Sequence, residues 1–490
     1  MHPHAFVQGA WRAPRAQARP LRRWNPANLR ELVYDGHCAE DHVSDAVEGA
    51  ARAQRAWGAL CLEERLAALD AFAEAFREHE RSLAMAIARE VGKPLGEALV
   101  EARALPSKWE VTRAAAPREL GRVEPAGVEG YYDWRPLGVF AVLGPFNFPM
   151  HLANGHILPA LAAGNAVVLK PSEVAPHCAT LYVEAWERAC ATSGMDPALL
   201  SLLPGDGVTG AALVDHPGVA GVAFTGSRRV GIALRQRLAA RPDVLLALEM
   251  GGKNAVLVWE DAALDAAAED IAFSAFATTG QRCTAASRVL VHPSVADAFL
   301  DRLLRAAERW CPGPPLAEET AMGPLATEAA YEHFVRAQGE RAGLRTWLEG
   351  GRDGESLERS AVVRSERPPG YWVRPAIHEV LDLEAQPQRW QEELFGPELL
   401  MERVGGEEAM LERANATRYG LATSVYTGDP GRFERMRPGL RCGLVHHNRP
   451  TIGASALLPF GGWKESGNHR PAGALTFRYV VGAVATLRSP

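Results

Sequence analysis

The sequence lacks several features that would define a protein class at once. Only seven of its 490 residues are cysteines, and no two of them form a CxxC pair. An odd number of scattered cysteines predicts reduced thiols in a cytoplasmic protein, and it argues against a disulfide framework or a zinc site. No apolar run approaches the ~18 residues of a membrane-spanning helix, so we expect no membrane partner.

A strong charge of either sign is also absent. Lys and Arg number 53 and Asp and Glu 59, which gives a formal net charge of -6. This balance offers no electrostatic reason to expect nucleic acid as a partner. Apolar residues make up 47%, so a chain of this length can bury a large core without disulfides or metals. The first 30 residues carry six Arg and no acid, but residues 6–11 look like a strand and a turn, so we expect a folded N-terminus.

Two periodicities predict an α/β fold. Residues 44–91 show apolar positions at helical spacing, and Gly92 and Pro94 form a helix stop. From residue 137 onward, short apolar runs alternate with helix-like or Gly-rich segments. Runs that are apolar on both faces suit buried parallel strands, and their alternation with helices predicts a doubly wound, Rossmann-like sheet. The expected strands are 139–143, 166–169, 199–203, 221–224, 244–248 and 255–259, with a second α/β region over 262–445 and a turn-rich loop at 350–370.

Polar and Gly-rich motifs follow the expected strands, where open α/β sheets place their ligands. They lie at 144–149, 170–173, 224–231, 248–253, 280–283, 392–397 and 459–462. No GxGxxG fingerprint occurs among them. His446 and His447 are neighbours in an expected strand, so their side chains should point to opposite faces. With no Cys, His and Asp cluster to complete a site, we expect no metal.

This ordered set of motifs resembles the NAD(P)-dependent aldehyde dehydrogenase superfamily over almost the whole chain. The resemblance implies an NAD-binding domain (1–115 and 137–250), an α/β catalytic domain (251–465) and a small β oligomerisation domain (116–136 and 466–490). The β-branched and aromatic tail at 476–486 suits a strand added to a neighbour's sheet. A homodimer or a dimer of dimers is therefore expected.

Three residues are the candidate catalytic groups. Cys283 would attack an aldehyde as a thiolate, and the resulting thiohemiacetal would lose hydride to a nicotinamide. Glu249 would activate water to cleave the thioester, and Asn147 would donate to the oxyanion. Each residue also has a purely structural interpretation: an inert buried thiol, a sheet-edge carboxylate and a turn asparagine. Glu249 favours release of a free acid, because superfamily members that transfer the acyl group to coenzyme A lack this base.

NAD is the expected cofactor, and the resemblance distributes its contacts over several strand ends. Glycines at the start of a helix would let the backbone approach the pyrophosphate, and the helix N-terminus would favour the anion. A carboxylate beside the adenosine ribose would favour NAD over NADP. The candidate contacts are Gly226, Ser227 and Gly231 for the pyrophosphate, Lys170 and Glu173 for the adenosine ribose, Glu393 for the nicotinamide ribose, and Phe146 near the nicotinamide.

Within the superfamily, residues 144–156, 448–455 and 466–471 resemble the succinylglutamate semialdehyde dehydrogenases of arginine catabolism. The resemblance implies a carboxylate-bearing semialdehyde as the substrate. Arg282 and Arg449 are candidates for binding its carboxylates, since Arg suits bidentate carboxylate recognition. Lys253 and Ala255 depart from that subfamily, and a dehydrogenase of another aldehyde is the fallback.

Two alternative functions, from other classes of protein, remain open. A Cys–Glu–Lys hydrolase, similar to amidases or nitrilases, would use Cys283, Glu249 and Lys170 without a dinucleotide. A non-catalytic relative would serve only as a binding or structural protein. The run of strand-end Gly motifs argues against the first, and the intact set of Cys283, Glu249 and Asn147 argues against the second.

Overall fold

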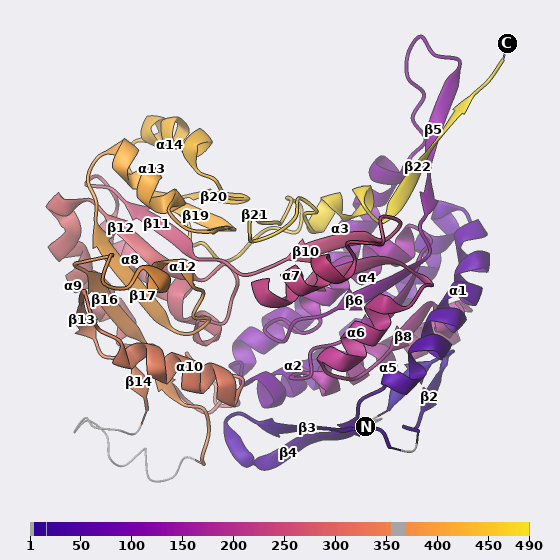
Figure 1. The fold of residues 1–490 in the computed structure, drawn as a ribbon, viewed down its shortest axis with the longest axis horizontal. Coiled ribbons are helices and arrows are strands. Elements are labelled where there is room, and N and C mark those ends of the chain that lie inside the picture. Colours follow the sequence, from indigo (N-terminus) through magenta and orange to yellow (C-terminus); the bar gives the residue numbers. More distant parts are fainter. Residues whose placement is uncertain (1–3, 16, 354–367, 490) are drawn as a thin grey trace.

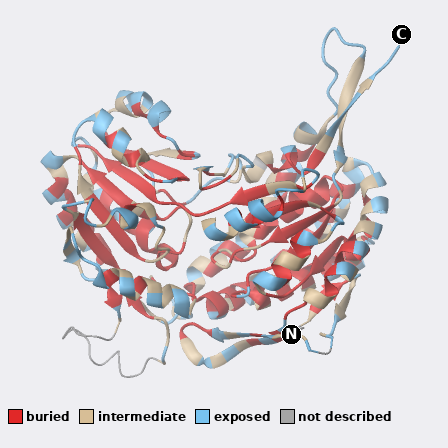
Figure 2. Cartoon of the chain, in the orientation of Figure 1, coloured by how far each residue is buried: buried red, intermediate tan, exposed pale blue. Residues whose placement is uncertain are grey.

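Two seven-stranded sheets organise the chain into two lobes (Figure 1). The computed structural model describes residues 4–15, 17–353 and 368–489. In both lobes the strands are buried and the outer faces of the helices are exposed (Figure 2). The expected α/β class is therefore confirmed. Most of the loop expected at 350–370 lies outside the described residues.

The first sheet has the order β10-β9-β6-β7-β8-β1-β2. The five strands at one end of this order run parallel, and β1 and β2 add an antiparallel edge. All residues of β6 and β7 are buried, which confirms the prediction of strands that are apolar on both faces. The strands are β1 (Ala5–Val7), β2 (Ala10–Arg12), β6 (Val139–Leu143), β7 (Ala166–Lys170), β8 (Leu200–Leu202), β9 (Val219–Thr225) and β10 (Leu245–Glu249).

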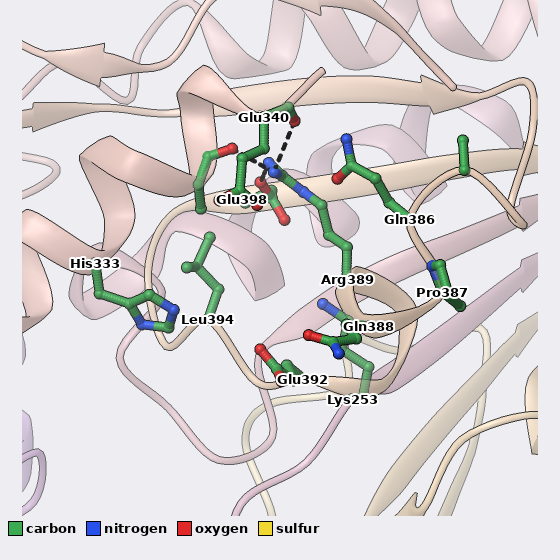
Figure 3. A pocket seen from close by; sticks show the side chains of 12 residues that line it. Lys253, His333, Glu340, Gln386, Pro387, Gln388, Arg389, Glu392, Leu394 and Glu398 are labelled. Atoms are coloured by element: carbon green, nitrogen blue, oxygen red, sulfur yellow. Dashed lines mark hydrogen bonds and ion pairs between the residues drawn. The ribbon is translucent and has the colours of Figure 1, made fainter. Parts of the chain in front are cut away.

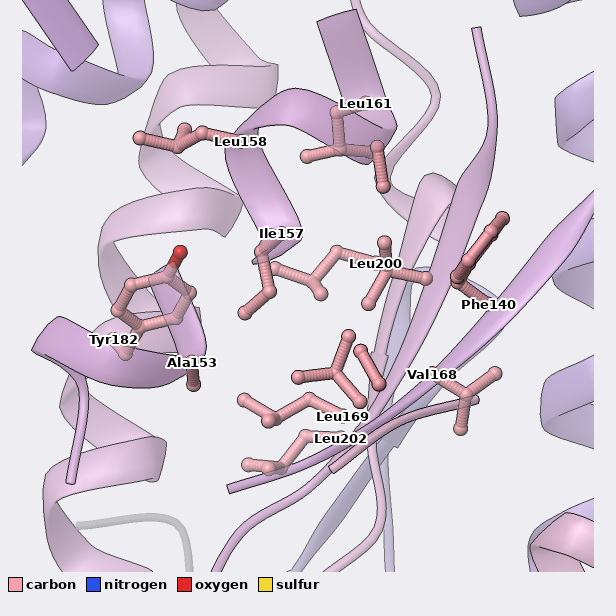
Figure 4. Close-up of a cluster of buried hydrophobic side chains, with 14 of the residues drawn as sticks. Phe140, Ala153, Ile157, Leu158, Leu161, Val168, Leu169, Tyr182, Leu200 and Leu202 are labelled. Carbon is pink, nitrogen blue, oxygen red and sulfur yellow. The ribbon is translucent and has the colours of Figure 1, made fainter. Parts of the chain in front are cut away.

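Helices cover this sheet on both sides, as a doubly wound fold requires (Figure 1). Figure 4 shows Leu169 of β7 on the same side of the strands as Ile157 of α4, whereas Val168, its neighbour in β7, points to the opposite side. The predicted helical segment 44–91 forms α1 and α2, and Gly92 ends it with a φ of 81° in the left-handed region. The helices are α1 (Val43–Ala59), α2 (Leu62–Val91), α3 (Leu95–Leu120), α4 (His151–Ala162), α5 (Pro176–Ser193), α6 (Gly207–Asp215) and α7 (Arg228–Arg237).

The second sheet has the order β13-β16-β17-β12-β11-β19-β20, in which only β13 is antiparallel to its neighbour. Its strands are β11 (Asn254–Val258), β12 (Ala286–Val291), β13 (Leu344–Leu348), β16 (Ala376–Val380), β17 (Glu398–Arg403), β19 (Ala422–Tyr426) and β20 (Leu444–His447). Its helices are α8 (Leu264–Phe276), α9 (Ala296–Ala307), α10 (Glu328–Gly339), α12 (Pro387–Gln391), α13 (Glu407–Asn415) and α14 (Pro430–Met436). The predicted second α/β region is therefore confirmed.

Four short strand pairs complete the fold. The strands β5 (Gly130–Pro136) and β22 (Val481–Leu487) pair antiparallel and project from the first lobe (Figure 1). The hairpin of β3 (Pro20–Asn25) and β4 (Asn28–His37) reaches the second lobe, where the Leu29 amide donates to the Pro369 carbonyl over 2.8 Å. The remaining pairs are β14 (Gly351–Arg352) with β15 (Val373–Arg374) and β18 (Tyr419–Gly420) with β21 (Trp463–Lys464).

The projecting arm corrects two expectations. Residues 116–120 belong to α3, so the arm begins after Gly121. The strand expected over 476–486 begins only at Val481, because Gly473–Arg478 forms a 3-10 helix. Thr476 there is fully buried, and its hydroxyl donates to the Gly155 carbonyl over 3.5 Å. Within the described part of the chain, no helix has the length and apolar character that a membrane crossing needs.

Candidate active site

The segment that carries Cys283 has an unusual backbone. Thr278, Thr279 and Gly280 lie in succession in the left-handed region, with φ values of 54°, 57° and 68°. A Cβ on Gly280 would lie 2.3 Å from the Gly396 carbonyl oxygen, so only glycine fits there. The turn therefore packs directly against the 392–397 motif. Cys283 lies three residues after Gly280 and is partly buried.

Asn254 fixes the main chain at the nucleophile. Its side-chain amide donates to the Cys283 carbonyl over 2.7 Å and to the Ala285 carbonyl over 2.8 Å. Its side-chain oxygen accepts from the Ala422 amide over 3.0 Å. The sequence analysis missed this residue, although it directly follows the 248–253 motif and begins β11.

Asn147 meets the nucleophile segment from the other lobe. It is buried just before α4, and its side-chain amide donates to the Gln281 carbonyl over 2.9 Å. An asparagine amide carries two hydrogens, and this bond uses one of them. The structure therefore brings the expected oxyanion donor to the segment that holds Cys283, and its role in binding the oxyanion stays a prediction.

Glu249 is the last residue of β10 and is buried. A Cβ on Gly461 would lie 3.0 Å from its Oε1, and its Oε2 has no hydrogen-bond partner in the described structure. Burial raises the pKa of this carboxyl well above its ordinary value, and the Gly462 amide opposes the rise. A buried carboxyl with one unpartnered oxygen and a raised pKa suits a general base.

Electrostatics connect three of the predicted residues. Burial, followed by the charges of Glu393 and Glu249, raises the pKa of the Cys283 thiol to about 12. The thiol is therefore protonated at neutral pH, whereas the thiolate is the nucleophile. Activation requires a nearby proton acceptor. Glu249 is one of the two carboxylates whose charge raises the Cys283 pKa, and its Oε2 has no hydrogen-bond partner in the described structure.

Glu393 lies against the glycine pair that follows Glu249. Its Oε1 accepts from the Gly252 amide over 2.9 Å, and a Cβ on Gly251 would lie 1.8 Å from its Oε2. Burial raises its pKa to about 7. Two residues further on, the ring of Phe395 meets that of Phe146 edge to face at 5.9 Å, across the two lobes. Phe395 was not among the predicted residues, although it lies inside the 392–397 motif.

The turn between β9 and α7 carries the predicted pyrophosphate residues. Ser227 caps α7, its hydroxyl accepting from the Val230 amide over 3.4 Å. The Gly226 amide donates to the Glu249 carbonyl over 3.0 Å, which places the turn beside the predicted base. Gly231 lies inside α7, where a Cβ would be 2.4 Å from the sulfur of Met250. Its lack of a side chain lets α7 pack closely on the end of β10.

Lys170 and Glu173 lie together after β7. The Lys170 ammonium is buried and 3.5 Å from the Glu173 carboxylate, which is about half exposed. Burial lowers the pKa of Lys170, and the charge of Glu173 opposes this shift. The pair presents a donor and an acceptor side by side, as two ribose hydroxyls require. Lys170 pairs with Glu173 and not with Glu249, which argues against the Cys–Glu–Lys set of a hydrolase.

The two arginines predicted to bind substrate differ. Arg282 donates to the Glu97 carboxylate over 2.6 Å and to the Thr278 hydroxyl over 2.8 Å. It already has a carboxylate partner in the protein, which argues against the predicted contact with a substrate carboxylate. Arg449 is exposed, and its main-chain carbonyl accepts from the Ser424 hydroxyl over 2.6 Å; its role in binding substrate stays a prediction.

The two adjacent histidines have structural partners. His446 Nδ1 lies 2.7 Å from the Pro450 carbonyl oxygen, and the His447 ring stacks on Phe433 at 4.4 Å. No cluster that could hold a metal ion occurs among the described residues.

A separate cavity of about 330 Å³ lies behind the 392–397 motif (Figure 3). Glu392 and Leu394, the neighbours of Glu393, line it together with Lys253. Figure 3 shows Arg389 crossing the cavity to pair with Glu398. None of Cys283, Glu249 and Asn147 lines this cavity, which is therefore distinct from the catalytic site.

Comparison with known proteins decides the family. The model of the aldehyde dehydrogenase family matches residues 11–482. The chain belongs to the aldehyde dehydrogenase family. It is 40% identical over 455 residues, 91% of this chain and 92% of the relative, to the N-succinylglutamate 5-semialdehyde dehydrogenase of Novosphingobium aromaticivorans. It is 41% identical to N-succinylglutamate 5-semialdehyde dehydrogenase 1 of Caulobacter vibrioides, covering 93% of this chain and 95% of that one.

Solved structures agree with this assignment. The 1-pyrroline-5-carboxylate dehydrogenase from Thermus with bound NAD superposes with a TM-score of 0.88 at 29% identity, covering 99% of this chain and 92% of that one. The aldehyde dehydrogenase fold predicted from the sequence is thereby confirmed, and the protein is an enzyme of this family.

Proposed function

We propose that this aldehyde dehydrogenase oxidises its substrate to a free carboxylic acid with NAD as the oxidant. The observation that carries the proposal is the convergence of Cys283, Glu249 and Asn147 from three segments at one buried place. A thiol, a carboxyl of raised pKa and an amide donor are the groups that thioester-forming oxidation and hydrolysis need.

The chemistry gives Cys283 and Asn147 one task each and uses Glu249 as the base in two steps. Glu249 accepts the Cys283 proton, and the sulfur adds to the aldehyde carbon while Asn147 donates to the developing oxyanion. Bound NAD supplies the hydride acceptor. Glu249 first releases the thiol proton to solvent and then takes a proton from water, which attacks the thioester carbonyl. The carbon–sulfur bond breaks, the acid leaves, and Glu249 returns its proton to the Cys283 thiolate.

The residues around the site fit NAD. Lys170 and Glu173 hold the adenosine ribose, and the turn at Gly226 and Ser227 receives the pyrophosphate at the start of α7. Glu393 binds the nicotinamide ribose once it leaves the Gly252 amide. The cradle formed by Gly251 supports this assignment, since any side chain there would displace the carboxylate. The test is to add aldehyde and NAD to the enzyme and to measure the products. Formation of NADH and of the acid, without ammonia, supports the dehydrogenase over the hydrolase alternative.

We further propose N-succinylglutamate 5-semialdehyde as the substrate. Two relatives of 40% and 41% identity that cover more than nine-tenths of the chain bear that name. The test is kcat/KM on this semialdehyde against neutral aliphatic aldehydes of similar length. A higher value on the semialdehyde supports the assignment, and equal or higher values on the neutral aldehydes overturn it.

The proposed division into an NAD-binding, a catalytic and an oligomerisation domain follows the two sheets and the arm of β5 and β22. Leu487, the last residue of β22, is 81% exposed. An apolar strand at an open edge supports pairing with another subunit in a dimer or a dimer of dimers. Sedimentation of the full chain against a variant lacking residues 481–490 tests this proposal.

A further inference from the structure

Lysine is the scarce basic residue of this chain. Only five of the 53 basic residues are lysines, so arginine fills nearly every position that needs a positive charge. Three of the five have evident protein partners: Lys93 pairs with Glu101, Lys170 with Glu173, and Lys464 donates to main-chain carbonyls. Among the described residues, Lys108 and Lys253 have no hydrogen bond or ion pair through their ammonium groups.

Lys108 is the more isolated of these two. Two carboxylates, Glu398 and Glu393, oppose the lowering of the Lys253 pKa. For Lys108, burial alone lowers the pKa, to about 8, and no acid opposes it. Withdrawing an ammonium from water without a compensating anion costs free energy. An unpaired ammonium at a crevice therefore indicates an anion supplied by a ligand.

The crevice lies where three segments meet. Lys108 and Thr112 of α3, Gly155 of α4, and Ala456 and Gly473 of the C-terminal region line it. Its volume is about 10 Å³, the room of one water or one carboxylate oxygen. The lysine reaches it over Gly155, where a Cβ would lie 2.9 Å from the ammonium nitrogen. A side chain on Gly155 would displace the ammonium group.

Both walls of this crevice lead back to the nucleophile. On one wall, the guanidinium of Arg282, the neighbour of Cys283, lies 5.1 Å from the ring of Phe148. The helix α4 begins three residues after Phe148 and contains Gly155. On the other wall, Phe460 packs in the same apolar cluster as Cys283, and the chain leads from it to Ala456. A substrate bound at Cys283 and lying between these walls therefore points its far end at Lys108.

A second polar atom on the same wall lacks a partner. His151 lies in the first turn of α4, its ring 6.2 Å from that of Phe148, and its Nδ1 is buried without a hydrogen bond. Burial and the charges of Lys108 and Lys93 lower its pKa to about 3, so the ring is neutral at physiological pH. A neutral imidazole next to an ammonium is available to a polar ligand that passes between Phe148 and Gly155.

We propose that Lys108 binds the distal, succinyl carboxylate of the substrate and so determines specificity for a long, doubly anionic semialdehyde. This inference rests on the proposed function. Phe148 lies three residues before α4, and from His151, the first residue of that helix, to Gly155 the helix rises ~6 Å over four residues at ~1.5 Å per residue. Eight bonds separate the aldehyde carbon from the succinyl carboxylate carbon, which is ~10 Å at ~1.2 Å per bond in an extended chain. The glutamate α-carboxylate, four bonds away, reaches only half as far.

The test compares two substrates that differ only in the distal charge. N-succinylglutamate 5-semialdehyde carries the carboxylate, and N-butanoylglutamate 5-semialdehyde has a methyl group in its place. For the wild-type enzyme we expect kcat/KM about 10- to 100-fold higher on the succinyl compound, the worth of a charged hydrogen bond. Lys108→Met should remove this ratio, mainly through KM, while activity on the butanoyl compound persists and shows that the variant is folded.

Two matched variants complete the test. Lys108→Arg keeps a positive charge and should retain part of the preference. Arg103→Met removes a charge from the exposed face of the same helix, where Arg103 pairs with Glu80, and should leave the ratio unchanged. If the wild-type enzyme prefers the succinyl compound and Lys108→Met still does, the inference is overturned and the substrate assignment stands. If the wild-type enzyme has the same kcat/KM on both compounds, no residue binds the distal carboxylate and the inference is overturned. The substrate assignment is then decided separately, by the comparison with neutral aliphatic aldehydes.

Discussion

Asn147 and Gln281 join the two lobes two residues before Cys283, the predicted nucleophile, through a hydrogen bond of 2.9 Å from the Asn147 side-chain amide to the Gln281 carbonyl. Asn147 follows β6 of the first sheet, and Gln281 precedes Cys283 in the second lobe. The bond fixes the amide donor relative to the nucleophile before substrate arrives. Such preorganisation lets a donor act on the oxyanion without reorganisation during the reaction.

Replacing the nucleophile separates chemistry from binding. We expect Cys283→Ser to lower kcat for aldehyde oxidation by about three orders of magnitude or more, since an alcohol is a far weaker nucleophile than a thiolate. The dissociation constant of NAD, measured by calorimetry, should stay within a few-fold of the wild-type value. Near-wild-type turnover by this variant would remove Cys283 from the mechanism.

Replacing the predicted base tests which step it serves. In the proposed mechanism Glu249 activates water, so Glu249→Gln should give a burst of NADH near one per active site, followed by slow turnover, and mass spectrometry should find acylated Cys283. Because Glu249 also accepts the thiol proton in that mechanism, the burst should be slower than in the wild-type enzyme and should speed up at high pH, where the thiol of raised pKa ionises unaided. Wild-type turnover by this variant contradicts the assignment of Glu249 as the base.

Cofactor choice should depend on Glu173. A carboxylate beside the adenosine ribose accepts from both hydroxyls of NAD and repels the 2′-phosphate of NADP. We expect Glu173→Gln to narrow the ratio of kcat/KM for NAD over NADP by about tenfold, the worth of one charge interaction. Arg228 already pairs with Glu465, and the exposed Arg229 offers the matched control: Arg229→Gln should leave the ratio unchanged. A wild-type enzyme that prefers NADP contradicts this assignment.

The pKa of Glu393, raised by burial to about 7, predicts a pH dependence of cofactor binding. Above pH 7 the group is a carboxylate and accepts from the ribose hydroxyls; below it the group is a neutral acid and a poorer acceptor. The dissociation constant of NAD should therefore rise as the pH falls from 8 to 6. Titration of Glu393→Gln by calorimetry should show no such rise. An equally steep rise in this variant assigns the titration to another group.

Much of this architecture could be predicted because its causes are local. Continuous apolar runs predicted β6 and β7, and glycine followed by proline predicted the end of α2. The role of Arg282 could not be predicted, since its partner Glu97 lies 185 residues away. Thr476 shows the same limit: its type favours a strand, but a buried contact with Gly155 holds it in a 3-10 helix.

The left-handed turn before Cys283 gives the last prediction. Gly280→Ala introduces two effects: a left-handed φ of 68° for a residue with a Cβ, which costs about 1–2 kcal/mol, and a clash with the Gly396 carbonyl, 2.3 Å from the new atom. Gly194→Ala is the matched control, because Gly194 has a φ of 74° and nothing within 4 Å of a Cβ. Both variants share the cost of the left-handed φ, so thermal denaturation should show a loss of stability in each, with a larger loss for Gly280→Ala because of the clash.

Only Gly280→Ala should move the nucleophile. Displacing a catalytic group by about 1 Å costs about 10²-fold in rate, so we expect its kcat to fall by that factor while kcat of Gly194→Ala stays near the wild-type value. The affinity for NAD should change less, because the Lys170 and Glu173 pair lies on other segments. If both variants keep full kcat, the contact of Gly280 with Gly396 does not position Cys283. If both lose it equally, the loss comes from general stability and not from this turn.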